Sequence, residues 1–531
     1  PVEMIKFFGG TAVITPEQRL EIAQRLDLSN ITLTERSYPI TMSRFVDIEY
    51  AQANEYHGYT RAQIKESMDP PSPPAGTAGF YQFTVLSDGY SGMTAEQLDA
   101  FIAANCRYSE RNYGVTSNLR GTGAYFVEAA KTYGINVDMS AVSVDFKAID
   151  KRKNAVINGL GFGLEAMLWK KSRGIDVIKG RARLLDAHTI EVDNGKVKKT
   201  VTAENIVVAV GSEPAEIAAF NVDHKKVITS NEIMDFSRPM PGSIVIIGSG
   251  AIGLEYGHIY SIYGVDVTIV EMMPNLVPAL HDTEITDAIK ASLEKRGIKV
   301  KCGSGIASVE VQEDGRVKST LANGEELFSD EVLVAIGRTL NTRGMGLEEV
   351  GVKMEKNGQI VTDEHMRTSV PNIFAAGDIT VGTQLSDKAQ RQGLVIAETI
   401  AGGDYYINYD AIPATMFMEP EIAMVGLTVS DAAERGIETI SGSLPFSSNE
   451  KAMAIGKTEG LIKVVARKDD HVIIGAQIFG HEACDLIAEM TVAVENGLTL
   501  EQVYNSIHPH PTVTEIILEV CKRAVGLSFD K

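Results

Sequence analysis

The sequence predicts an α/β protein in which a parallel sheet is followed by a smaller α+β region. Three observations support this prediction. Residues 243–270 read as strand, glycine turn, helix and strand, and from about residue 139 short β-branched runs alternate with helical segments. After Tyr409, strand-like runs are followed by two helical segments. A strand–helix–strand unit brings the second strand back parallel to the first, so the middle of the chain favours a parallel sheet.

The first 138 residues are expected to form a mainly helical segment. Thr94–Gln97 has the pattern of a capping box at a helix start, and a second helix is predicted over Thr122–Thr132, with Gly134 as its stop. The proline-rich stretch Asp69–Gly76 is predicted to be a linker, because proline cannot continue a helix or a central strand.

The later elements follow from hydrophobic periodicity and glycine punctuation. In the middle of the chain we expect a long helix within Phe146–Lys171, strands at Asp176–Lys179, Thr189–Val192, Asn205–Ala209 and Ser243–Ile247, a helix ending near Tyr263, and a strand at Asp266–Val270. Near the C-terminus we expect strands at Ile422–Gly426, Gly460–Val465 and Val472–Phe479, with two helices behind them.

Composition narrows the class of protein. The 531 residues include 50 basic and 70 acidic side chains, a net charge of −20, which argues against the basic surface that nucleic acid requires. With 44% hydrophobic and 23% charged residues, the chain has the composition of a folded globular protein. No apolar run approaches the roughly 20 residues of a membrane span. We therefore expect no nucleic-acid partner, no membrane partner and a cytoplasmic location.

Cysteine spacing argues against a metal or local redox site. The four cysteines, at positions 106, 302, 484 and 521, form no CxxC or CxxxxC pair. Zinc sites and redox dithiols are normally built from closely spaced cysteines. We expect no bound metal.

The strongest motif is a glycine turn after a buried strand. Gly248, Gly250 and Gly253 follow the apolar strand 244–247 in a GxGxxG pattern. Such glycines permit a tight turn, close approach to a pyrophosphate and close helix packing. Glu271 ends the next strand, 18 residues after Gly253 (271 − 253), where an acid can accept hydrogen bonds from both ribose hydroxyls and repel a 2′-phosphate. The motif predicts a Rossmann-type domain that binds NAD rather than NADP.

From about Met139 to the end, the sequence resembles the dihydrolipoamide dehydrogenase branch of the pyridine nucleotide–disulfide oxidoreductases. Four segments carry the resemblance: Val207–Pro214, Gly250–Glu255, Ala335–Arg338 and Asn372–Asp378. The resemblance implies that Glu255 lies beside the nicotinamide and flavin, that Gly211 and Ser212 belong to the turn leaving an FAD domain, and that Asp378 hydrogen-bonds the FAD ribitol. It also implies that Gly337 and Arg338 close the NAD domain and that Gly377 belongs to the second flavin motif.

A fifth segment, Ile507–Glu515, resembles the part of an interface domain that supplies a catalytic base. By this resemblance His510 is the base and Glu515 orients its imidazole. His508 is expected to be structural. The resemblance also implies a homodimer formed through residues 409–531, and a lipoyl-bearing 2-oxoacid dehydrogenase-type complex as partner.

The chain departs from the family pattern at its N-terminus. Residues 1–138 contain no GxGxxG turn for an FAD diphosphate, and Cys106 is their only thiol where the family has a CxxxxC pair. Asp387 stands where the family usually has a histidine. We therefore expect FAD to bind weakly or not at all. Residues 1–138 instead resemble a fragment of a bacterial cell-wall glucosaminidase, on the segments 40–46, 81–83, 92–98 and 118–136. Two families would then be joined near residue 138, through a natural fusion, an engineered chimera or an artefact of sequence assembly.

These observations predict five regions: 1–138, glucosaminidase-like; 139–229, an incomplete FAD domain; 230–355, an NAD domain; 356–408, a central domain completing the FAD region; and 409–531, an interface domain. The expected function is that of a dihydrolipoamide dehydrogenase-like NAD-dependent flavoprotein oxidoreductase, impaired because its dithiol and FAD diphosphate turn are missing. Two alternatives stand beside it: a non-catalytic NAD-binding dimeric scaffold, and a cell-wall glucosaminidase fusion.

Overall fold

The computed structural model describes residues 144–168 and 175–527, so the predictions made for residues 1–138 lie outside the described residues. The described residues divide between two compact units. Residues 158–168 and 175–177 belong to one unit, and residues 144–157 and 178–527 to the other, which carries every site discussed below. Helix α8 (Phe146–Leu168) spans the boundary, and its observed range confirms the long helix predicted within Phe146–Lys171.

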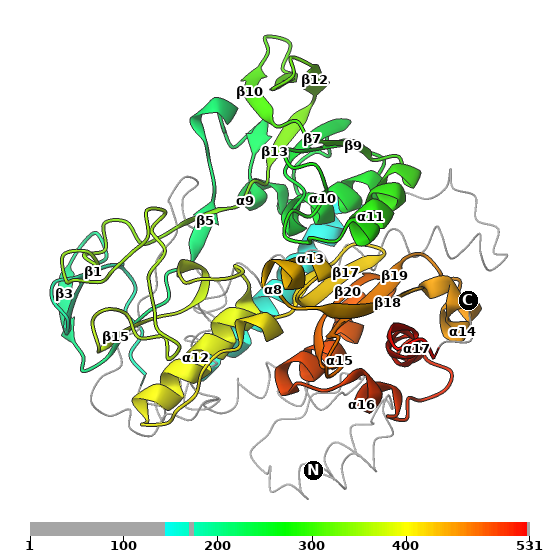
Figure 1. Cartoon of the computed structure of the whole chain (residues 1–531). Helices are drawn as coiled ribbons and strands as arrows, with labels where there is room; N and C mark the ends of the chain where they lie inside the picture. The colour runs from blue at the N-terminus through cyan, green and yellow to red at the C-terminus, as the bar shows by residue number, and fades with distance from the viewer. Residues whose placement is uncertain (1–143, 169–174, 528–531) are drawn as a thin grey trace, which may run out of the picture. The chain divides into compact units, whose positions relative to one another are not determined.

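The larger unit contains a five-stranded parallel sheet (Figure 1). Its strand order is β6-β13-β7-β8-β9, with every neighbouring pair parallel. Helix α10 connects β7 to β8, as predicted for a strand–helix–strand unit, and helix α11 connects β8 to β9 in the same way. The bounds are Val227–Ile228 (β6), Ser230–Ile233 (α9), Ser243–Ile247 (β7), Ala251–Ile262 (α10), Asp266–Glu271 (β8), Thr283–Lys295 (α11), Lys299–Cys302 (β9) and Glu331–Val334 (β13).

The strands of this sheet are almost continuously apolar because both of its faces are buried. Residues Ile244 to Ile247 of β7 are all buried, because helices or other strands cover both faces of a parallel sheet. A three-stranded antiparallel sheet is inserted between β9 and β13, made of β10 (Ile306–Val311), β11 (Val317–Leu321) and β12 (Glu326–Ser329).

A second group of strands precedes and follows this sheet in sequence. Strand β4 pairs in parallel with β15, and β5 pairs antiparallel with β14, so segments about 130 to 170 residues apart meet here. The elements are β1 (Arg181–Leu184), β2 (Thr189–Asp193), β3 (Lys198–Thr202), β4 (Ile206–Val208), β5 (Ser212–Pro214), β14 (Arg338–Leu340), β15 (Ile373–Ala375) and α12 (Ser386–Ile400).

The C-terminal region is an α+β unit, as predicted. Its antiparallel sheet has the order β16-β17-β20-β19-β18. The strands are Ala414–Met416 (β16), Glu421–Gly426 (β17), Thr439–Pro445 (β18), Leu461–Arg467 (β19) and Ile473–Gly480 (β20). The helices are Val429–Glu434 (α13), Glu450–Ala454 (α14), Ala483–Asn496 (α15), Leu500–Tyr504 (α16) and Glu515–Ala524 (α17).

Two expectations about local structure were wrong, and strand β3 was not predicted. Residues 176–179 form no strand, and the first strand of this region begins at Arg181, where buried and exposed positions alternate. Strand β3 was missed because its lysines and threonines are almost all exposed and give no apolar alternation. Three helices, not two, follow β20, because Thr499 caps the short helix α16 between α15 and α17. Among the described residues, no helix has the length and apolar character needed to cross a membrane.

Candidate functional site

The glycine turn lies at the carboxyl edge of the parallel sheet, between β7 and α10. Gly248 has a φ of +104°, and a Cβ placed on it would lie 2.4 Å from the carbonyl oxygen of Ala335. A Cβ on Gly253 would lie 2.1 Å from the carbonyl oxygen of Gly248. Gly250 is the N-cap residue of α10, and a Cβ placed on it would have no heavy atom within 4 Å outside its own neighbourhood. The first and third glycines therefore serve packing, while the second leaves room for a ligand beside the helix N-terminus.

Glu271 ends β8, the strand next to β7, and its carboxylate is bonded to the glycine turn. Its Oε2 accepts hydrogen bonds from the Ser249 hydroxyl at 2.7 Å and the Ser249 backbone N–H at 3.0 Å. Its Oε1 accepts one from the N–H of Met273 at 2.9 Å. Glu271 is only 6% exposed. The acid predicted to recognise a ribose is thus held against the turn predicted to hold a pyrophosphate.

Glu255 lies on α10, two residues after the third glycine, and is buried. Its Oε1 accepts a hydrogen bond from the backbone N–H of Phe417, at 2.9 Å, in the segment between β16 and β17. Burial raises the pKa of Glu255 to about 7, and the Phe417 N–H opposes that rise only in part. This carboxyl can therefore hold or release a proton near neutral pH.

The residues predicted to contact a flavin meet at one place. The Ser212 hydroxyl is hydrogen-bonded to Asp378 and accepts a hydrogen bond from Arg338 Nε at 2.6 Å. A second guanidinium nitrogen of Arg338 donates to the Ser212 carbonyl oxygen at 2.5 Å. Arg338 Nε lies 3.7 Å from Asp378 Oδ2. Three segments far apart in sequence thus form one charged cluster, which leaves Asp378 partly accessible.

Glycines shape the backbone around this cluster. Gly211 has a φ of +64° and Gly377 a φ of +82°, a backbone conformation that favours glycine. The carbonyl oxygen of Gly337 accepts a hydrogen bond from the N–H of Ala215 at 2.9 Å, which ties β14 to β5. The polar groups and turns here fit the ribitol end of a flavin as the resemblance describes it.

A buried polar network supports the Gly377–Asp378 turn, and its role was not predicted from the sequence. Gln392 accepts the Gly377 N–H at 2.8 Å through Oε1 and donates to the Thr380 hydroxyl at 2.8 Å through Nε2. Lys388 is 0% exposed, and its Nζ donates to the carbonyl oxygens of Val381 at 3.0 Å and Thr380 at 3.3 Å. Desolvation lowers the pKa of Lys388 to about 8, against the attraction of Asp378. The one feature of the sequence that could have indicated this network is a lysine, Lys388, on the otherwise apolar face of helix α12.

The structure brings His510 and Glu515 together in the C-terminal region. His510 Nδ1 lies 3.0 Å from Glu515 Oε1, and Glu515 Oε2 accepts the N–H of Thr512 at 2.9 Å. The His510 side chain is 66% exposed. The Thr512 N–H and His510 lower the pKa of Glu515. The His508 side chain, in contrast, is only 7% exposed, and its Nε2 lies 2.9 Å from Glu489 Oε1.

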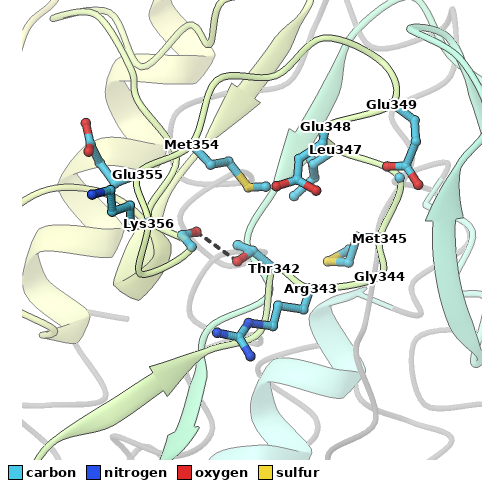
Figure 2. A pocket seen from close by; sticks show the side chains of 12 residues that line it. Thr342, Arg343, Gly344, Met345, Leu347, Glu348, Glu349, Met354, Glu355 and Lys356 are labelled. Atoms are coloured by element: carbon cyan, nitrogen blue, oxygen red, sulfur yellow. Dashed lines mark hydrogen bonds between the residues drawn. The ribbon is translucent and has the colours of Figure 1, made fainter.

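A cavity of about 240 Å³ lies between residues 342–349 and 354–358 (Figure 2). Met345, Leu347 and Met354 line it, and the Thr342 hydroxyl donates to the Gly358 carbonyl oxygen at 2.8 Å. No sequence motif predicted this cavity. Its side chains form no nucleophile–base pair, and none of the predicted site residues lines it.

The described cysteines do not supply a redox pair. Among the described residues, Cys302, Cys484 and Cys521 form no disulfide with one another. Burial raises the pKa of Cys302 and of Cys521, which disfavours the reactive thiolate at neutral pH. The described residues also hold no group of three or more His, Cys, Asp or Glu side chains placed to bind a metal ion.

Comparison with protein families gives two matches. The model described as pyridine nucleotide-disulphide oxidoreductase matches residues 117–393, and the model of that family's dimerisation domain matches residues 412–521. The first match begins at residue 117, inside the segment 1–138 that was predicted to resemble a glucosaminidase. Residues 117–138 therefore align with the oxidoreductase family. The glucosaminidase-like segment and the chimera remain predictions without support from these matches.

Two curated relatives are bacterial dihydrolipoyl dehydrogenases. The protein of Geobacillus stearothermophilus is 38% identical over 403 residues, which cover 76% of this chain and 85% of the relative. That of Bacillus subtilis is 35% identical over 411 residues, covering 77% of this chain and 86% of the relative.

Solved structures share the fold. LpdA from Mycobacterium tuberculosis aligns with a TM-score of 0.71 at 24% identity, covering 82% of this chain and 98% of the other. The flavoprotein disulfide reductase RclA from Escherichia coli aligns with a TM-score of 0.66 at 23% identity, covering 77% and 89% of the two chains.

Proposed function

The chain belongs to the pyridine nucleotide-disulphide oxidoreductase family, and from this membership we propose that it is an NAD-dependent flavoprotein oxidoreductase related to dihydrolipoyl dehydrogenase. One observation carries the NAD part of the proposal. The glycine turn 248–253 lies at the carboxyl edge of a parallel sheet, and the carboxylate of Glu271 stands at the end of the next strand, bonded to that turn. Dinucleotides bind at this edge of such sheets.

Each NAD-binding residue would have a distinct role. The backbone N–H groups at the start of α10, beside Gly250, would bind the pyrophosphate. Glu271 would accept a hydrogen bond from the adenosine ribose and repel a 2′-phosphate. Glu255, by the family resemblance, would lie near the nicotinamide. NAD, when bound, supplies the hydride acceptor of the reaction.

Flavin binding is proposed to be weak. Asp378 and the turns at Gly211 and Gly377 would hold the ribitol. The sequence has no second GxGxxG turn for the flavin diphosphate, so much of the usual binding energy is missing. An absorption spectrum after gel filtration tests this directly. A stoichiometric yellow cofactor would show that other residues replace the missing turn.

Catalysis by His510 and Glu515 is proposed with a restriction. Their 3.0 Å contact leaves the imidazole exposed, so it could exchange a proton with a group on another molecule or subunit. The missing CxxxxC pair removes the dithiol that would receive electrons from a dihydrolipoyl group.

A lipoyl-bearing complex as partner and a cytoplasmic location both stay predictions. The missing pair also favours the second candidate, a dimeric NAD-binding scaffold without turnover. NADH-dependent reduction of an artificial acceptor would exclude the scaffold.

Titration calorimetry with NAD tests the proposed function. The wild-type chain should bind NAD, and Glu271→Gln should weaken binding by about tenfold, the value of one hydrogen bond to a charged group. Glu326→Gln, an exposed carboxyl on β12, is the matched control and should bind as wild type does. Absence of NAD binding to the wild-type chain would defeat the proposal.

A further inference from the structure

Ser249, the residue between the first two glycines of the turn, connects three segments of the NAD domain. Its hydroxyl donates to Glu271 Oε2 at 2.7 Å and accepts the backbone N–H of Val277 at 3.1 Å. Its own backbone N–H donates to the same Oε2 at 3.0 Å. The hydroxyl therefore joins the glycine turn, the end of β8 and the loop that follows β8.

The burial of this cluster makes its hydrogen bonds consequential. Ser249 and Val277 are 0% and 1% exposed, and Glu271 is 6% exposed. In such a place water cannot easily replace a lost donor, so each bond to the carboxylate matters more than at the surface. Val277 has a φ of +50°, an unusual conformation for a β-branched residue, and its N–H bond to Ser249 helps to hold it.

The acceptor capacity of Glu271 shows what remains for a ligand. An ionised carboxylate can accept about four hydrogen bonds, two at each oxygen. Ser249 supplies both donors at Oε2, and Met273 supplies one at Oε1. About one acceptor position is left, on Oε1. The carboxylate is held in one orientation, and its remaining acceptor position lies on Oε1.

We propose that Ser249 is a positioning residue that sets the preference for NAD over NADP, by holding the Glu271 carboxylate in a fixed position beside the glycine turn. This inference rests on the proposed binding of NAD. A fixed negative charge favours a ribose hydroxyl, which can donate to it, and repels a 2′-phosphate. Without the Ser249 hydroxyl, the carboxylate loses one of three donors and is freer to turn away from the ligand.

The test compares NAD and NADP dissociation constants for the wild-type chain, Ser249→Ala and Ser249→Gly. Both variants lack the hydroxyl but keep the backbone N–H. We expect the ratio of NADP to NAD dissociation constants to fall by about tenfold in each, mainly through weaker NAD binding. Ser319→Ala removes an equally buried serine hydroxyl from β11 and should leave the ratio unchanged.

The outcomes separate this inference from the proposed function. If the wild-type chain does not bind NAD, both fail. If the wild-type chain binds NAD but the variants lose NAD and NADP affinity equally, Ser249 only supports the fold and this inference alone is overturned. If Ser249→Ala does not fold, Ser249→Gly, which has the smaller side chain, still gives the ratio.

Discussion

Glu255 accepts a hydrogen bond from the backbone N–H of Phe417 at 2.9 Å, and this bond links the NAD-domain helix α10 to the C-terminal region. Apolar packing reinforces the link, because Met416 and Met418 on either side of Phe417 belong to the same buried core as the α10 residues Leu254 and Tyr256. Helix α10 and the C-terminal region are thus joined by a titratable group.

Glu255→Gln should change how stability depends on pH. The pKa of Glu255 is raised from 4.5 to about 7 in the folded state, so the folded state binds the proton more tightly than the unfolded state between these values. Stability of the wild-type chain therefore falls from about pH 4.5 to about pH 7, and the glutamine variant escapes this loss. In urea unfolding, the free energy of unfolding of the variant should rise by on the order of 2 kcal/mol relative to that of wild type between pH 5 and pH 8. An equal difference at both pH values would contradict the prediction, and Glu313→Gln, an exposed carboxyl, serves as control.

Lys388→Met should change the pH dependence of stability in the opposite direction to Glu255→Gln. Burial lowers the pKa of Lys388 from 10.5 to about 8, so the unfolded state holds the proton more tightly between these values. Wild-type stability therefore gains a contribution as the pH rises from about 8 to about 10.5, and the methionine variant lacks it. Unfolding at pH 7.5 and pH 10 should show the variant losing on the order of 1–3 kcal/mol relative to wild type over this range. Lys356→Met, at an exposed lysine, should show no such trend, and a trend of the same size there would refute the assignment to Lys388.

Ile507→Glu should weaken self-association. Ile507 is 99% exposed, although it is apolar and only three residues from His510. The family's dimerisation domain matches residues 412–521, so we expect a second copy of the chain to cover this isoleucine. Analytical ultracentrifugation at micromolar concentration should show a dimer for wild type and a shift toward monomer for the variant. Val197→Glu, an exposed apolar residue beside β3, should remain dimeric. A wild-type monomer at these concentrations would exclude the proposed dimer.

Turnover of dihydrolipoamide should be negligible. The reaction passes electrons through an enzyme disulfide, whose two Cα atoms must lie about 4.4–6.8 Å apart. The chain has no CxxxxC pair to guarantee this proximity, and the three described cysteines form no disulfide with one another. NAD reduction by dihydrolipoamide should therefore stay at background in wild type, with any activity limited to slow transfer from NADH to an artificial acceptor. Robust turnover that persists in Cys106→Ser would show an electron path other than a thiol pair containing Cys106.

The sequence predicted the strand–turn–helix–strand unit around the glycine turn well, because its signals are local. Strands β7 and β8 and helix α10 lie where hydrophobic periodicity and the glycine turn placed them. A buried parallel strand needs a continuous apolar run, and a tight turn needs glycine. Both features can therefore be predicted from residues that are adjacent in the sequence. His510 and Glu515, five residues apart, also lie in contact, while their catalytic role stays a prediction.

Only the tertiary structure decided how the charged groups are partnered. The serine between the first two glycines gave no signal that it would bind Glu271, 22 residues away, and the Arg338–Ser212–Asp378 cluster depends on β5 pairing with β14. Lys388 could be read as one more helix residue until the fold buried it beneath the Gly377–Asp378 turn. Motif and period are properties of adjacent residues, whereas burial and hydrogen-bond partners depend on which distant segments fold against them.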